Sequence, residues 1–254
     1  MPNKAVVVHE SKDQLIQAVA GRFVSVVRAV LEGRPTVHVC LTGGSVGIAV
    51  LGAIAEHAEV GALEWERVHV WWGDERWLES GDTERNDHQA DVALLTRVAI
   101  PASNVHRFPA ADAGVALDDA ALLYRGELAR HASNGGAAPA FDVTFLGVGP
   151  DGHVASLFPH FEQVNAQDSV VAVRNSPKPP PERLSLTLPV INSSERIWLA
   201  LAGADKASPI GLALAGASRD LVPVAGVKGV LETVFFVDED AAADVPRELI
   251  VDSY

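Results

Sequence analysis

Apolar, β-branched segments alternate with segments of helical periodicity along almost the whole chain, and this alternation constrains the fold more than any other feature. Residues 5–9 read as a strand, and residues 12–32 carry apolar side chains at helical spacing after a capping residue at Ser11. Alternating strands and helices predict an α/β fold with a doubly wound, mostly parallel, Rossmann-like sheet flanked by helices. Because no repeat or linker interrupts the chain, we expect a single domain over residues 1–254. The expected strands are 5–9, 36–41, 67–72, 141–146, 169–173, 183–188, 196–202 and 233–237, and the expected helices are 12–32, 48–57, 86–98, 111–131 and 205–215.

The composition limits the classes of partner. Acidic residues number 33 against 20 Lys and Arg, which gives a net charge of −13. Nucleic acids and anionic membranes need an extended basic surface, so we expect neither as a partner, whereas a local positive pocket can still bind an anionic small molecule. The one cysteine, Cys40, lies in an apolar run and permits no internal disulfide. Without a signal-peptide pattern or an apolar stretch near the ~20 residues of a membrane span, the chain is expected to be cytoplasmic. Its oligomeric state is not specified by any pattern.

A glycine pair follows the second predicted strand. Thr42-Gly43-Gly44-Ser45 separates that strand from a helix, so free N–H groups at the helix start can face an anion. The pattern is neither GxGxxG nor a P-loop, which weakens a nucleotide interpretation. A glycine turn needed only for tight packing explains the segment about equally well.

Charged residues follow the third predicted strand. In WWGDERW, Asp74 can bind sugar hydroxyls or accept a proton, and the Arg76 guanidinium suits a phosphate or carboxylate. The flanking tryptophans indicate a partly enclosed pocket. A surface turn with a local ion pair is the alternative, and Asn86 nearby is equally well explained as the start of a helix.

The strand at 141–146 runs into a turn that carries Asp151-Gly152-His153. In an open α/β sheet, ligands bind beyond the carboxyl ends of the strands, and histidine is the side chain best suited to proton transfer near neutral pH. No further metal ligands stand out among the other histidines, and no G-x-S-x-G elbow supports a nucleophilic serine. The alternative is Asp151 as a helix cap with a structural histidine behind it.

Taken together, these segments resemble the 6-phosphogluconolactonase family, which is related to the glucosamine-6-phosphate deaminases. The resemblance rests on LTGGS, WWGDERW, FLGVGPDGHVASLFP, residues 176–187 and residues 202–207, in the expected order. The deaminases continue from Asp-Gly-His to an acidic residue used in ring opening, but here Phe158 occupies that position. The resemblance therefore favours a lactonase, with a deaminase or isomerase as the alternative. A sugar-phosphate sensor without turnover is a third possibility, which the presence of His153 disfavours.

The resemblance implies hydrolysis of 6-phosphoglucono-δ-lactone to 6-phosphogluconate, a step of the oxidative pentose phosphate pathway, without metal or other cofactor. It implies His153 as the general base, with Asp151 orienting the loop or the imidazole. The same resemblance puts the sugar against Asp74 and Arg76. The phosphate is expected on Gly43, Gly44 and Ser45, with Lys206 as the counter-charge and Arg183 assisting.

Overall fold

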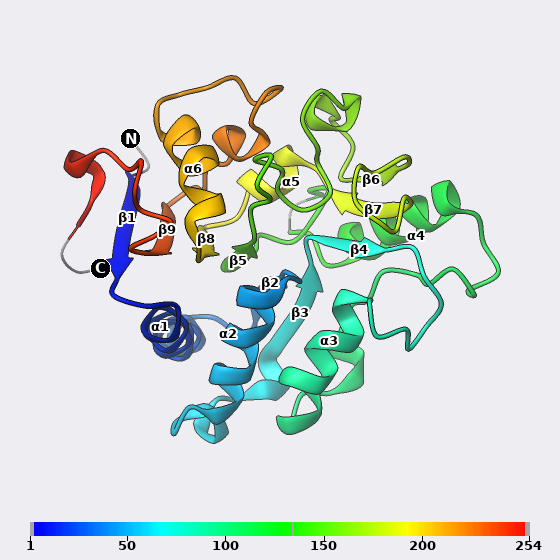
Figure 1. The fold of residues 1–254 in the computed structure, drawn as a ribbon. Coiled ribbons are helices and arrows are strands. Elements are labelled where there is room, and N and C mark those ends of the chain that lie inside the picture. The colour runs from blue at the N-terminus through cyan, green and yellow to red at the C-terminus, as the bar shows by residue number, and fades with distance from the viewer. Residues whose placement is uncertain (1–2, 134, 252–254) are drawn as a thin grey trace.

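The computed structural model describes residues 3–133 and 135–251, and six strands within them form one sheet in the order β1-β9-β8-β5-β2-β3 (Figure 1). Every neighbouring pair in this sheet is parallel. The predicted mostly parallel α/β sheet is therefore confirmed. Its strands are β1 (Asn3–His9), β2 (Val37–Leu41), β3 (Val68–Trp72), β5 (Val143–Leu146), β8 (Arg196–Leu201) and β9 (Glu232–Asp238).

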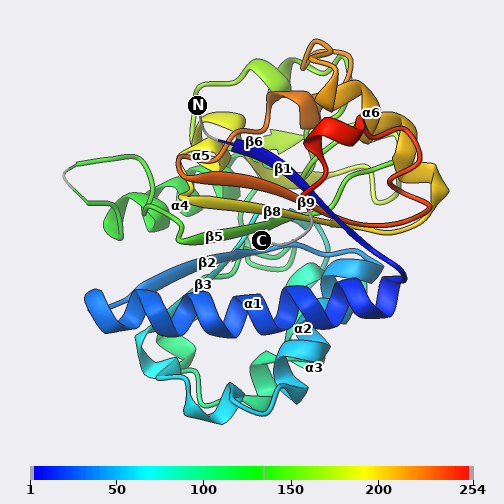
Figure 2. The same cartoon turned by 90° about the vertical axis from the view of Figure 1, so that its left-hand side faces the viewer.

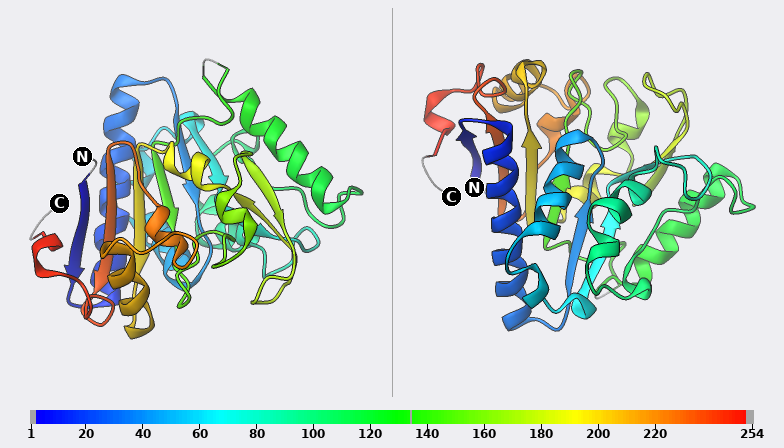
Figure 3. Two further views of the ribbon diagram at one scale, coloured as in Figure 1. Left: turned by 90° about the horizontal axis from the view of Figure 1, so that it is seen from above. Right: turned by 60° about the horizontal axis from the view of Figure 1, so that its bottom comes forward.

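Helices cover both faces of the sheet. On one face lie α1 (Lys12–Gly33), α2 (Ser45–Glu56) and α3 (Asn86–Ala93), as Figures 2 and 3 show. On the other lie α4 (Leu117–Arg130), α5 (Leu188–Asn192) and α6 (Ala207–Leu214). Residues such as Val39, Val143 and Ile197 are fully buried between these layers, as expected for a parallel sheet covered on both faces.

Helix α1 differs from the expectation that no stretch approaches the length of a membrane span. By length and composition alone, its 22 residues could cross a membrane. However, Leu15, Val19 and Phe23 are buried, and the Phe23 ring lies 5.8 Å from that of Phe145 on β5. The apolar face of α1 is therefore packed in the core.

A second, antiparallel sheet was not expected. It consists of β4 (Asp74–Arg76), β7 (Arg183–Leu186) and β6 (Val170–Val173), in that order. The Asp-Glu-Arg segment is thus a short strand rather than an open turn, and it pairs with a segment more than a hundred residues later. This pairing fixes Asp74 opposite Ser185 and Arg76 opposite Arg183.

The ends of several helices differ from prediction for local reasons. The helix expected from residue 111 begins at Leu117, because Gly114 has a positive φ of 76°. The helix expected to reach residue 98 ends at Ala93, because Leu94 leaves helical geometry (φ −139°). The helix expected from residue 48 begins at Ser45.

The tryptophans of WWGDERW were interpreted incorrectly. Trp71 and Trp72 are fully buried on β3, in the hydrophobic core. Neither lines the cavity beside Asp74 and Arg76. Burial of a strand on both faces explains them without any ligand. Cys40 on β2 is likewise buried and free, as predicted.

Candidate active site

The segments that follow β2, β3 and β5 meet at one cavity of about 290 Å³. Because parallel strands end at the same edge of the sheet, this is the edge where ligands bind in open α/β folds. Two predicted residues do not line this cavity: Ser45 faces an adjoining cavity of about 110 Å³, and Asp151 lies behind His153. The predicted residues that line it are Gly43, Gly44, Asp74, Arg76, His153, Arg183 and Lys206.

Positions 43 and 44, after β2, require glycine for two different structural reasons. Gly44 is the N-cap of α2 and has a φ of 83°, which favours glycine. A Cβ on Gly43 would lie 1.9 Å from Oδ1 of Asn86, so the backbone can approach Asn86 only without a side chain. The packing explanation thus holds for Gly43, and the start of α2 still presents its N–H groups toward the cavities.

Asn86 is a site residue that sequence reasoning noticed without assigning. Its Nδ2 donates to the backbone oxygen of Asp74 (2.8 Å), and its Oδ1 is buried with no hydrogen-bond partner among the described residues. An unpaired buried acceptor costs free energy of about 1–3 kcal/mol. Asn86 lines the cavity, but this oxygen is packed against Gly43 and shielded from solvent, so the role of Asn86 is to hold the β4 segment and not to bind a ligand.

His153 and Asp151 form a hydrogen-bonded pair. The His153 Nδ1 lies 2.5 Å from Asp151 Oδ1, within a tight turn closed by the Gly152 N–H donating to the Gly149 oxygen (2.9 Å). Partial burial alone would raise the pKa of Asp151, but the hydrogen bond and the charges of His153 and Lys178 outweigh it and lower that pKa to about 2. An ionised carboxylate only accepts, so Nδ1 carries the proton and Nε2 holds the lone pair of a neutral ring.

Asp74, on β4, is a buried carboxylate at the cavity wall. Its Oδ2 accepts a hydrogen bond from Ser156 Oγ (2.7 Å), and Asn86 holds its backbone oxygen. The neighbouring Arg76 donates from Nη1 to the Glu84 oxygen (2.6 Å) and also lines the cavity. Both side chains are therefore held in place by the protein before any ligand arrives.

Glu75 lies between Asp74 and Arg76 on β4. Its side chain points away from the cavity and accepts hydrogen bonds from the start of α3. Its two carboxylate oxygens accept from the backbone N–H groups of Asn86 (2.7 Å) and Asp87 (2.9 Å). Burial raises the pKa of Glu75 to about 7, although Arg85 and these N–H groups oppose the shift. The Glu75 carboxylate takes the place of an N-capping side chain. It thereby attaches α3 to β4.

Arg85, which no pattern had indicated, is the buried cation of this network. Its side chain is 1% exposed and donates from Nε and Nη2 to the two oxygens of Asp87, each at 3.0 Å. It also donates to the backbone oxygens of Leu78 (3.2 Å) and Phe108 (3.0 Å). One guanidinium thus joins the segment after β4, α3 and the loop before α4.

Three further cations surround the cavity. Lys206 is paired with Asp205 Oδ2 (2.7 Å), and its side chain is only 19% exposed rather than solvated. Arg183 is buried and donates to the backbone oxygens of Lys178 (3.2 Å), Pro179 (3.0 Å) and Pro180 (3.2 Å). Lys178, which the sequence interpretation did not assign to the site, also lines the cavity.

Phe158 is buried beside the proposed base. Its ring lies 4.6 Å from the His153 ring, and the Arg183 guanidinium lies 5.8 Å from it. Phe158, which stands where the resemblance implies an acidic residue in deaminases, is thus an apolar support for His153 and, through Arg183, for the proline-rich loop (residues 176–181).

Comparison with known proteins supports the resemblance. Residues 10–235 match the model of the family described as Glucosamine-6-phosphate isomerases/6-phosphogluconolactonase. A 6-phosphogluconolactonase of Mycobacterium tuberculosis is 43% identical over 247 residues, which cover 96% of this chain and 99% of that protein. One of Streptomyces coelicolor is 43% identical over 249 residues, covering 96% and 95%. The crystal structure of 6-phosphogluconolactonase from Thermotoga maritima has a TM-score of 0.82 at 27% identity and covers 93% of this chain and 100% of that one. The chain therefore belongs to the glucosamine-6-phosphate isomerase/6-phosphogluconolactonase family.

Proposed function

We propose that this protein is an enzyme that hydrolyses 6-phosphoglucono-δ-lactone to 6-phosphogluconate. The observation that carries the proposal is the His153–Asp151 pair beside a cavity lined by Arg76, Lys178 and Lys206. On a chain with a net charge of −13, this local excess of cations suits an anionic substrate. Relatives of similar length carry the name of this activity.

In the proposed reaction, the Nε2 lone pair of His153 takes a proton from water as the water oxygen attacks the lactone carbonyl carbon. Asp151 holds the ring in the tautomer that leaves Nε2 free and stabilises the imidazolium that forms. The carbon–oxygen double bond becomes a tetrahedral oxyanion. Collapse of this oxyanion breaks the bond to the ring oxygen, and Nε2–H returns its proton to that leaving oxygen.

Charge stabilisation of the oxyanion is assigned to the cations of the cavity. Arg76 is held in place by Glu84 and Lys178 lies on the proline-rich loop, so both are candidate partners for developing negative charge. The Asp74 carboxylate is an acceptor at the cavity wall, which suits it to the hydroxyl groups of the sugar. The reacting carbon is thus proposed to lie between acceptors for the sugar and donors for the oxyanion.

The phosphate is proposed to lie at the start of α2. Gly43, Gly44 and Ser45 border two adjoining cavities, and Lys206 lines both of them. The N–H groups of the first helical turn and the helix dipole favour an anion there. Arg183 has an indirect role, because it uses its donors to hold the backbone of residues 178–180.

The direct test is a coupled assay in which glucose 6-phosphate oxidation generates the lactone and acid release is followed. We expect hydrolysis well above the spontaneous rate. The alternative, a deaminase, is tested by adding glucosamine 6-phosphate and measuring ammonia. Ammonia release without lactone hydrolysis would overturn the proposal, and activity on neither substrate would favour a binding protein.

Lys206→Ala is expected to raise KM for the phosphorylated lactone by about 10-fold or more, with kcat changed less, because a charge-assisted contact to a dianion contributes about 1.5–3 kcal/mol. On glucono-δ-lactone, which lacks the phosphate, the same variant should behave like the wild type. Steady-state kinetics with both lactones provide the measurement. Equal losses on both would place Lys206 outside phosphate recognition.

A cytoplasmic location fits the proposed activity. Cys40 is buried on β2, and burial raises the pKa of its thiol, so it is neither a disulfide partner nor a reactive nucleophile within the described residues. The proposed partner is the phosphorylated lactone alone.

A further inference from the structure

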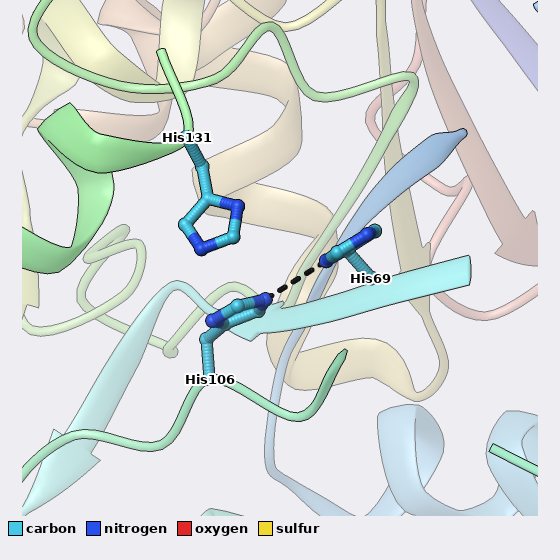
Figure 4. A group of neighbouring side chains, drawn as sticks. All are labelled: His69, His106 and His131. Atoms are coloured by element: carbon cyan, nitrogen blue, oxygen red, sulfur yellow. Dashed lines mark hydrogen bonds between the residues drawn. The ribbon is translucent and has the colours of Figure 1, made fainter. Parts of the chain in front are cut away.

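Three histidines that are far apart in the sequence lie together at the end of the sheet opposite the cavity described above (Figure 4). His69 is the second residue of β3, His106 lies in the connection between α3 and α4, and His131 directly follows α4. One ring nitrogen from each lies within 4.8 Å of the others. Spacing along the chain gives no sign of this cluster, so it was not predicted from the sequence.

Glu127 fixes the orientation and tautomer of the central imidazole. Its Oε1 lies 2.7 Å from His106 Nδ1, and since a carboxylate only accepts, Nδ1 carries the proton. The His106 Nε2 lone pair then accepts a hydrogen bond from Nδ1–H of His69 (3.0 Å), and a bound ion would take the place of that proton. A carboxylate behind a histidine in this way is the usual support of a metal-bound imidazole.

The spacing of the nitrogens suits a tetrahedral ion. Zn–N bonds of about 2.0–2.1 Å put two tetrahedral ligands about 3.3 Å apart, between the 3.0 Å of the closest pair and the 4.8 Å limit of the cluster. His131 is partly exposed and its Nε2 lies 3.4 Å from Glu127 Oε1, so its ring would have to turn from that carboxylate to close the remaining distance. Three imidazoles without a carboxylate ligand select zinc-like ions over Mg²⁺ or Ca²⁺.

We propose that His69, His106 and His131 form a binding site for Zn²⁺ or a similar transition-metal ion, with water as the fourth ligand.

The surroundings support this site. His131 caps the carboxyl end of α4, where the helix dipole favours a cation. A cavity of about 350 Å³ lies beside His106 and Glu127, but His69 and His131 do not line it. His38, whose ring lies 4.8 Å from that of His69, is excluded from the ligand set because its Nδ1 accepts from Trp71 Nε1 (3.1 Å).

The site is separate from the catalytic one. His69 precedes Gly73, the first residue after β3, by four strand positions, which corresponds to about 13 Å along the strand. Its expected role is structural, because an ion there would join β3 at the sheet edge to the end of α4. Metal binding should therefore raise the stability of the folded protein. This stabilisation can be measured without an activity assay.

The test uses chelator-treated full-length protein titrated with Co²⁺, which absorbs strongly in the visible when tetrahedral, and with Zn²⁺ in competition. We expect one ion per chain and a higher Tm with Zn²⁺ but not with Mg²⁺. His131→Ala should abolish the cobalt spectrum and the Tm increase. Glu127→Gln, which keeps all three ligands, should weaken binding by about 10–100-fold.

Two matched variants separate this site from other histidines. His57→Ala, at the end of α2, and His153→Ala, in the catalytic pair, should both bind cobalt like the wild type. A wild-type protein that gives no tetrahedral spectrum would overturn the proposal. So would a spectrum that survives in His131→Ala or disappears in His153→Ala.

Discussion

Replacing His153 with alanine is expected to lower kcat for lactone hydrolysis by about 10²–10⁴-fold, the usual contribution of a general base. KM should change little, because the phosphate and the sugar hydroxyls are assigned to other side chains. Initial rates with lactone generated in situ, over a range of pH, provide the measurement.

Two variants calibrate this result. His57→Ala removes an imidazole that lines none of the cavities described above, and it should keep full activity. Asp151→Asn keeps the base but weakens its orientation, so we expect a smaller loss than with His153→Ala. Turnover of His153→Ala near the wild-type level, in protein of unchanged circular dichroism, would remove His153 from the mechanism.

Arg85→Ala is expected to lower the free energy of unfolding by about 3–5 kcal/mol, because it removes the buried cation beside Glu75 and Asp87 and leaves Asp87 with the more exposed Arg107, 3.8 Å away. Glu75 and Asp87 are 1% and 9% exposed at their side chains, so water does not replace the guanidinium. The backbone oxygens of Leu78 and Phe108 lose their donor as well. Urea unfolding monitored by tryptophan fluorescence measures the change.

Arg97→Ala is the matched control. Its guanidinium is 43% exposed and lies 3.7 Å from Glu56, so the expected loss is at most about 1 kcal/mol. If Arg85→Ala does not fold, Arg85→Lys keeps a charge but loses the paired donors, and it should still be clearly less stable than the wild type. A loss from Arg85→Ala no larger than that from Arg97→Ala would contradict the structural role.

The sheet could be predicted from local pattern because each strand carries its own signal. Apolar runs such as 37–41 and 143–146 are too short and too β-branched for helices, and the intervening helices impose parallel connections. The same logic located the site, since loops after parallel strands share one edge. Gly43, Asp74 and His153 were therefore predicted together although they are far apart in the chain.

Other features depend on long-range packing that no local pattern records. The pairing of β4 with β7 joins residues 74–76 to 183–185, and Arg85 is buried only because β4, α3 and the loop before α4 converge on it. In the sequence, Lys178 is one residue in a proline-rich segment and gives no sign of a role. In the structure, Arg183 donates a hydrogen bond to its backbone oxygen and holds it at the cavity. The three histidines have no common spacing, so only the fold brings them together.

The position of β1 has a consequence for synthesis of the chain. β1 is an edge strand of the six-stranded sheet, and its neighbour β9 is made more than 200 residues later. At about 5–20 residues per second, β1 waits on the order of tens of seconds for that partner. During this time Val6, Val7 and Val8 form an unpaired apolar strand, which is a template for aggregation. In a nascent chain, β1 should thus depend on α1, or on a chaperone, for protection until β9 has been made.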